Sequence, residues 1–121
     1  MSKQFFNDEE FVKISNRDLM KKLSKNYSVF ERGRSLLQLA RRSGKDLKKI
    51  ELVIAQIQDI DNRNARTVGL VSIAHLGVAG LLEANTSITR SAANKLIKEW
   101  SEPDRSNLLD FLESFLRVGQ G

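Results

Sequence analysis

The fold is decided by the stretch Val68-Gly-Leu-Val-Ser-Ile-Ala-His-Leu-Gly-Val-Ala-Gly-Leu-Leu-Glu-Ala84, the longest apolar-rich run in the chain. A helix that spans a bilayer needs about 20 predominantly apolar residues. This run is shorter, and it contains Ser72, His75 and Glu83. A helix that is apolar nearly all round is typical of a protein interior. We therefore predict a central, buried helix over residues 65–84, whose glycines let neighbouring helices approach closely.

Helical spacing of apolar residues continues on both sides of this run, and Pro103 is the only proline. The spacing predicts further helices over residues 16–26, 29–42, 47–58, 88–100 and 104–118. Ser15 and Asp46 stand where N-caps are expected, and Gly44 stands where a helix should stop. The polar run 59–64 is typical of a turn. The sequence thus predicts an all-α fold, a compact single-domain bundle of about six helices with a buried central helix.

The same periodicity predicts which side chains face the core. The helix over 47–58 should bury a stripe that begins at Leu47, and the helix over 88–100 should bury a face that begins at Ile88. Phe30 and Leu109 also lie on predicted apolar faces. The remaining predicted core positions in these helices are Leu36, Leu37, Leu39, Ala40, Ile50, Val53, Ile54, Ile57, Ala92, Leu96, Ile97, Leu108, Phe111, Leu112, Phe115 and Leu116.

A length of 121 residues fits one domain. We expect a flexible N-terminal segment over residues 1–14, which Phe5, Phe6 and Phe11 can attach to the core, and a helical domain over residues 15–118. The first residues lack a basic start followed by an apolar run, so no secretory signal is expected. The chain has no cysteine, which fits a reducing compartment. A cytoplasmic location is the expectation.

No catalytic constellation is recognisable in the sequence. Without cysteine, thiolate catalysis, disulfides and cysteine zinc sites are excluded. His75 is the only histidine, and its apolar neighbours favour a core role over general-base catalysis. Asp59 and Asp61 are paired carboxylates, but their turn-prone surroundings explain them better than acid–base chemistry. No strand is predicted that could precede a phosphate-binding loop. We predict that the protein is not an enzyme and has no cofactor or metal.

Basic residues are concentrated in one part of the chain. Of the 20 lysines and arginines, half lie between Lys21 and Lys49, where only Glu31 and Asp46 oppose them, and the whole chain carries a net charge of +5. Such charge favours RNA or an acidic protein surface as partner. The alternative is an ordinary solvated set of helix faces. The candidate binding residues are Arg34, Arg41, Arg42, Lys45, Lys48, Lys49, Arg63 and Arg66.

Further details of this basic region leave alternatives open. Arg34, Arg41 and Lys45 are spaced by seven and four residues, so they share a face while a helix continues. Tyr27 and Phe30 lie within the region and can stack on bases, although core anchoring is the commoner role for both. An amphipathic membrane helix ranks lower, because the predicted helices are short and mutually packed. Homo-oligomer formation remains open.

Three stretches share a pattern with known helical cores: Ile14-Ser-Asn-Arg-Asp-Leu-Met20, Leu76-Gly-Val-Ala-Gly-Leu-Leu-Glu-Ala84 with Asn85-Thr-Ser-Ile-Thr-Arg-Ser-Ala92, and Asp104-Arg-Ser-Asn-Leu-Leu-Asp-Phe-Leu-Glu-Ser-Phe-Leu116. They resemble parts of the core shared by the pneumovirus transcription antitermination protein and the filovirus transcription activator. The matches follow the family order over about a third of the chain. The zinc finger that precedes the core in both families has no counterpart here, because cysteine is absent.

A rival resemblance covers fewer residues. Ala93-Asn-Lys-Leu-Ile-Lys-Glu-Trp-Ser-Glu-Pro103 is similar to the last helix of the elongation-factor N-terminal domain of the TFIIS and Iws families. Gly80 and Glu83 stand where that family has apolar residues. Such domains bind short acidic-hydrophobic motifs in disordered partners.

Both resemblances imply a non-enzymatic module. The leading hypothesis is an accessory factor of transcription or genome packaging that binds RNA, a protein partner or both through a basic helical face. The alternative is a pure protein–protein interaction module, such as an elongation-factor-like adaptor, a scaffold or an immunity protein.

Overall fold

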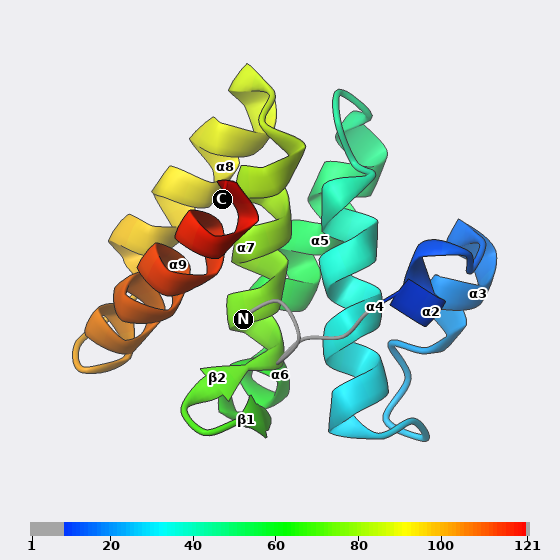
Figure 1. Cartoon of the computed structure of the whole chain (residues 1–121), viewed down its shortest axis with the longest axis horizontal. Helices are drawn as coiled ribbons and strands as arrows, with labels where there is room; N and C mark the ends of the chain where they lie inside the picture. The colour runs from blue at the N-terminus through cyan, green and yellow to red at the C-terminus, as the bar shows by residue number, and fades with distance from the viewer. Residues whose placement is uncertain (1–8, 121) are drawn as a thin grey trace.

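The computed structural model describes residues 9–120, which form eight helices and one small hairpin (Figure 1). The predicted all-α class is confirmed, since the two-stranded sheet is the only other regular element in this part of the chain. The elements in order are α2 (Glu9–Val12), α3 (Asn16–Lys21), α4 (Val29–Arg41), α5 (Leu47–Gln58), α6 (Ile60–Asn64), β1 (Arg66–Val68), β2 (Val71–Ser72), α7 (Ile73–Ala84), α8 (Ser87–Glu99) and α9 (Asp104–Gln120).

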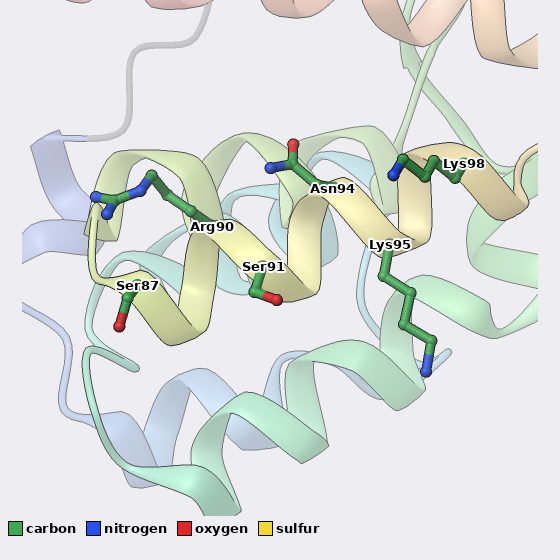
Figure 2. Close-up of a pocket in the computed structure, with 6 residues that line it drawn as sticks. All are labelled: Ser87, Arg90, Ser91, Asn94, Lys95 and Lys98. Atoms are coloured by element: carbon green, nitrogen blue, oxygen red, sulfur yellow. The ribbon is translucent and has the colours of Figure 1, made fainter.

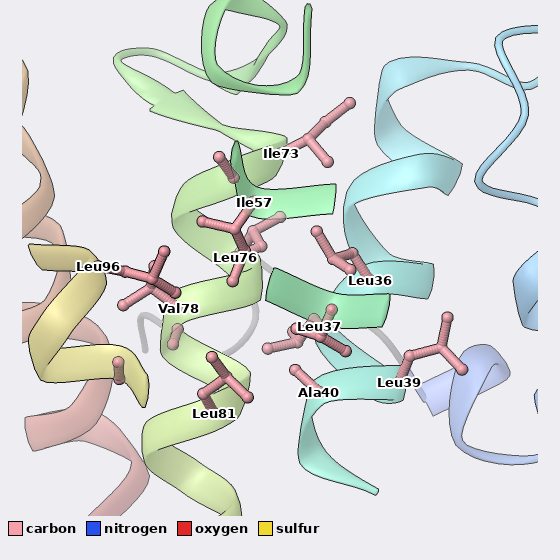
Figure 3. Close-up of a cluster of buried hydrophobic side chains, with 14 of the residues drawn as sticks. Leu36, Leu37, Leu39, Ala40, Ile57, Ile73, Leu76, Val78, Leu81 and Leu96 are labelled. Carbon is pink, nitrogen blue, oxygen red and sulfur yellow. The ribbon is translucent and has the colours of Figure 1, made fainter. Parts of the chain in front are cut away.

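Helix α7 lies at the centre of the molecule. In Figure 1 it runs between α4 on one side and α8 with α9 on the other, and α5 lies behind. Every residue from Ile73 to Leu81 is buried. Figure 3 shows side chains of α4, α5, α7 and α8 meeting around α7, among them Leu37, Ile57 and Leu96. The predicted buried central helix is therefore confirmed.

Helices α4 and α7 approach each other closely at Gly80. A Cβ atom built there would lie 2.5 Å from the Cβ of Ala40 and 2.6 Å from the carbonyl oxygen of Leu37. Real Cβ atoms do not approach other heavy atoms so closely, so only glycine fits without a shift of the backbone. The sequence prediction that the glycines of this helix permit close packing holds here.

The start of the central helix differs from the prediction. Helix α7 begins at Ile73, and residues 60–72 form α6 and the antiparallel β1–β2 hairpin instead. Gly69 has a φ of +53°, a left-handed conformation that a continuing helix cannot contain. Ser72 then caps α7, because its hydroxyl accepts the backbone N–H of His75 at 3.2 Å. The expectation that the chain has no strands was therefore wrong.

Most predicted helix boundaries are confirmed. Ser15 accepts the backbone N–H of Asp18, and Asp46 accepts those of Lys48 and Lys49. Gly44 follows α4 with a φ of +51°. Helix α3 ends at Lys21, five residues before its predicted end, and the run 59–64 contains the short helix α6 rather than a plain turn.

The N-terminal helices are attached to the core through Arg42 and Phe11. The Arg42 guanidinium donates to the carbonyl oxygens of Ile14 at 2.6 Å, Val12 at 2.8 Å and Phe11 at 3.1 Å. Phe11 itself is buried, as an attachment point should be. Phe5 and Phe6 lie outside the described residues, as does most of the segment predicted to be flexible. Among the helices described, none is both long and apolar enough to cross a bilayer.

Four side chains that periodicity places in the core are partly exposed. They are Leu47 at 59%, Phe30 at 47%, Leu109 at 46% and Ile88 at 37%. Phe30 is covered in part by the guanidinium of Arg34, whose carbon lies 3.8 Å from the ring centroid. Leu47 and Ile88 lie on α5 and α8, and both line one hollow between these helices.

Candidate functional site

Three of the arginines predicted to bind a partner are engaged inside the protein. Arg34 is only 1% exposed and lies over the Phe30 ring. The Nε of Arg41 donates to Glu83 at 2.7 Å, which joins α4 to α7. Arg42 bonds the carbonyl oxygens of the N-terminal segment. Arg34 is therefore buried, whereas Arg41 and Arg42 are partly exposed and join separate parts of the chain.

The two arginines after α5 lie in a different region. The guanidinium of Arg63 lies 4.3 Å from the centroid of the Trp100 ring, and its Nε donates to the carbonyl oxygen of Ile57 at 3.3 Å. Arg66 is exposed and donates to the carbonyl oxygen of Leu70 at 3.1 Å. Arg63 thus holds α6 and Trp100 together, and Arg66 stabilises the β1–β2 hairpin.

The predicted lysines do reach the surface. Lys45 lies in the turn after Gly44, and Lys48 and Lys49 lie in the first turn of α5. All three are exposed. Asp46 caps the helix beside them, and its carboxylate lies 4.0 Å from the ammonium of Lys49. Lys45 and Lys48 make no ion pair with any residue that the structure describes.

A second group of basic residues lies on α8 and was missed by the sequence analysis. Figure 2 shows Arg90, Lys95 and Lys98 along this helix. They line a hollow of about 490 Å³. The lining residues are Ser87, Arg90, Ser91, Asn94, Lys95 and Lys98. Arg90 bonds the side chain and carbonyl of Asn85. Lys95 and Lys98 have no ion-pair partner within residues 9–120.

An open groove of about 510 Å³ separates α5 from α8. We call it the α5–α8 groove; it is lined by Leu47, Ile50, Glu51, Ile54, Ser87, Ile88, Ser91, Ala92 and Lys95. It shares Ser87, Ser91 and Lys95 with the hollow on α8, so the two form one continuous surface. Both helices pack against α7. At one end the hydroxyl of Thr86 donates to the carbonyl oxygen of Gly44 at 2.9 Å, which joins the two turns that precede them.

Two lysines on α8 line this surface, and two more are exposed at the start of α5. We call Lys45, Lys48, Lys95 and Lys98 the basic rim; all four are exposed. Glu51 is the one acidic side chain in the lining of the groove. The first turns of α5 and α8 lie at the same end, where helix dipoles add positive potential. The surface therefore combines aliphatic side chains with a net positive charge.

His75 is buried, as the sequence predicts. It is 1% exposed, and its Nδ1 accepts the backbone N–H of Ser72 at 3.2 Å. Its ring lies 5.7 Å from that of Trp100 and 6.2 Å from that of Phe111, measured between centroids. Burial, with a smaller effect from the charge of Arg66, lowers the pKa of His75 from 6.5 to about 4. Within the described residues no three histidines or carboxylates cluster as metal ligands would.

The depressed pKa of His75 predicts a loss of stability in acid. The unfolded chain protonates this histidine near pH 6.5, whereas the folded protein keeps it neutral down to about pH 4. Unfolding therefore takes up a proton between these values, and stability falls as the pH is lowered through them. Between pH 7 and pH 5 we expect the free energy of unfolding to fall by about 2 kcal/mol more in wild type than in His75→Gln. Urea denaturation at both pH values measures this; equal losses in the two proteins would contradict it.

Comparison of the chain with protein-family models, with curated proteins and with solved structures finds no match in any of the three. The functional proposal therefore rests on the geometry of the α5–α8 surface.

Proposed function

We propose that the protein is a non-enzymatic binding module that recognises an anionic partner, RNA or an acidic protein segment, through the α5–α8 groove and its basic rim. The observation that carries this proposal is that Lys95 and Lys98 line this surface from α8, while Lys45 and Lys48 are exposed at the start of α5, the other helix of the groove. No carboxylate of the described chain is paired to any of the four. Ammonium groups left to solvent attract an anion without first having to break an internal ion pair.

The surface that supports the proposal differs in part from the predicted one. Lys45, Lys48 and Lys49 remain candidates for contact, and Arg90, Lys95 and Lys98 join them from α8. Arg34 is buried, and Arg41 and Arg42 are partly exposed but already bond Glu83 and the carbonyl oxygens of the N-terminal segment.

The cellular setting of the proposal comes from the resemblances. The short stretches similar to viral transcription factors support an accessory factor of transcription or genome packaging that acts in the cytoplasm. The stretch similar to the elongation-factor N-terminal domain supports an adaptor that binds protein alone. The exposed Leu47 and Ile88 favour this second candidate, because aliphatic side chains in a groove contribute more to protein recognition than to RNA recognition.

Charge reversal on α8 tests the proposal. We expect Lys95→Glu with Lys98→Glu to weaken binding of fluorescent oligouridine and of polyglutamate by about tenfold or more, since two attractive charges become repulsive. Fluorescence anisotropy measures both at about 50 mM and 200 mM salt, and wild-type affinity should fall steeply between them. The matched control is Lys13→Glu with Arg17→Glu, two exposed residues near α2 and α3 that give the same change in net charge.

The control variant should bind both probes nearly as well as wild type does. If wild type binds neither probe, the proposal fails. If both double variants weaken binding equally, the positive charge acts without a defined site, and the proposal fails as well.

A further inference from the structure

We infer that the α5–α8 groove binds an amphipathic helix of a partner protein, with aliphatic side chains along one face and carboxylates along the edge that faces α8. This inference rests on the proposed function and names the chemical class of the partner.

The aliphatic lining of the groove favours a protein helix. Leu47 is 59% exposed and Ile88 is 37% exposed, although the periodicity of both helices would bury them. Isolated apolar residues on a surface are ordinary, but these two line the same hollow together with Ile54 and Ala92. The lining contains no aromatic ring on which a base could stack. A strip of leucine or isoleucine side chains fits this surface better than a nucleic acid does.

The dimensions of the groove suit about two turns of helix. Its lining runs from Leu47 to Ile54 on α5 and from Ser87 to Lys95 on α8. At 1.5 Å per residue each wall is therefore roughly 11–12 Å long. A helix presents apolar anchors at i, i+3 or i+4, and i+7 over that length. The groove therefore accommodates one amphipathic segment whose three anchors reach Leu47, Ile54 and Ile88.

The charges along the groove set the chemistry of the partner's edges. Lys95 belongs to the lining itself, and Lys98 lies one turn further along α8. Their aliphatic stems can lie along an apolar strip while the ammonium groups meet carboxylates beside it. Glu51 is the single acidic side chain in the lining, and it lies on the α5 side. Glutamate or aspartate on the edge that faces α8 therefore complements the groove.

The groove is held open before any partner arrives. Helices α5 and α8, which form its two walls, both pack against α7, whose residues from Ile73 to Leu81 are buried in the core. The Thr86–Gly44 hydrogen bond fixes the end at which both helices start. A partner helix thus meets a surface that needs little rearrangement, which reduces the entropic cost of binding.

A synthetic peptide tests this inference. The probe is a fluorescein-labelled, helix-forming peptide of about 14 residues with leucines at i, i+3, i+7 and i+10 and glutamates beside them. One control peptide has the same composition with the leucines scattered, and another has lysine in place of glutamate. Fluorescence anisotropy with the full-length protein should show that the first peptide binds at least tenfold more tightly than either control.

Leu47 and Ile60 provide a matched pair of protein variants. Each is the first residue of a helix after an aspartate N-cap, and they are 59% and 66% exposed, but only Leu47 lines the groove. Leu47→Ser should weaken peptide binding by about tenfold, because one apolar anchor loses its contact. Ile60→Ser should bind the peptide as wild type does.

The results separate this inference from the proposed function. If Lys95→Glu with Lys98→Glu abolishes peptide binding while Leu47→Ser or the scattered peptide changes nothing, the rim binds anions without the groove and the amphipathic-helix inference falls. If oligouridine binding depends on Leu47 and the peptide does not bind, the groove belongs to RNA. If neither probe depends on the rim lysines, the proposed function falls as well.

Discussion

Replacing Gly80 with alanine is expected to destabilise the protein by about 3 kcal/mol, because the added methyl group has no room between α7 and α4. It would meet the Cβ of Ala40 at 2.5 Å and the carbonyl oxygen of Leu37 at 2.6 Å. The second of these atoms belongs to the backbone of α4 and cannot rotate away. Alanine favours a helix over glycine by about 1 kcal/mol, and that gain is too small to offset the separation of two core helices.

Gly33→Ala is the matched control for this change. A Cβ at Gly33 would meet the Cδ1 of Leu76 at 2.8 Å and the Cγ2 of Thr67 at 2.9 Å. Both atoms belong to side chains rather than to the backbone of a helix, so they can shift at lower cost than the Leu37 carbonyl can. Urea denaturation should therefore give a much smaller loss of unfolding free energy for Gly33→Ala. A larger loss at Gly33 than at Gly80 would show that the α4–α7 contact is looser than described.

Ala79→Asp is expected to cost about 4 kcal/mol, a large fraction of the free energy of unfolding of a domain of this size. Ala79 is fully buried on α7, and a carboxylate there has to be either an unpaired charge or a neutral acid without its hydrogen bonds. Ala55→Asp, at an exposed position on α5, introduces the same side chain into a helix without burial. Thermal unfolding followed by circular dichroism should show a large drop in midpoint for the first variant and a small one for the second. An unaltered midpoint for Ala79→Asp would mean that α7 is not the core helix.

The core could be predicted because it depends on local pattern. A run that is apolar on every side has to be buried, and α7 is buried from Ile73 to Leu81. Its start could not be predicted in the same way. Residues 65–72 have enough apolar character to extend a helix, but Gly69 adopts a left-handed conformation and Ser72 caps a helix that starts only at Ile73. The β-branched residues Thr67, Val68 and Val71 around Gly69 were the available signal for a hairpin.

The candidate site was harder to predict because charge along a sequence does not show where each charge is used. Arg41 lies among the basic residues of the chain, yet its partner Glu83 is 42 positions away. Helix α4 is covered on several sides, so its residues from Arg32 to Ala40 are buried regardless of polarity. On α8 the signal was the polar spacing from Ser87 to Lys98, which matters only once α5 lies beside it. Leu47 and Ile88 were assigned to the core because periodicity cannot show that two apolar stripes end at an open groove.

The attachment of the N-terminal helices by Arg42 has a consequence for the order in which acid acts on the molecule. A guanidinium keeps its charge throughout the acid range, and the carbonyl oxygens of Phe11, Val12 and Ile14 do not titrate. The contact between Lys25 and Asp61 is different, because the lysine lowers the pKa of that carboxyl, and the pair is lost when the carboxyl is protonated. Acidification therefore acts first on the interior, through protonation of His75, and then on the ion pair between Lys25 and Asp61. The hydrogen bonds that attach the N-terminal helices to Arg42 contain no group that changes charge in this range.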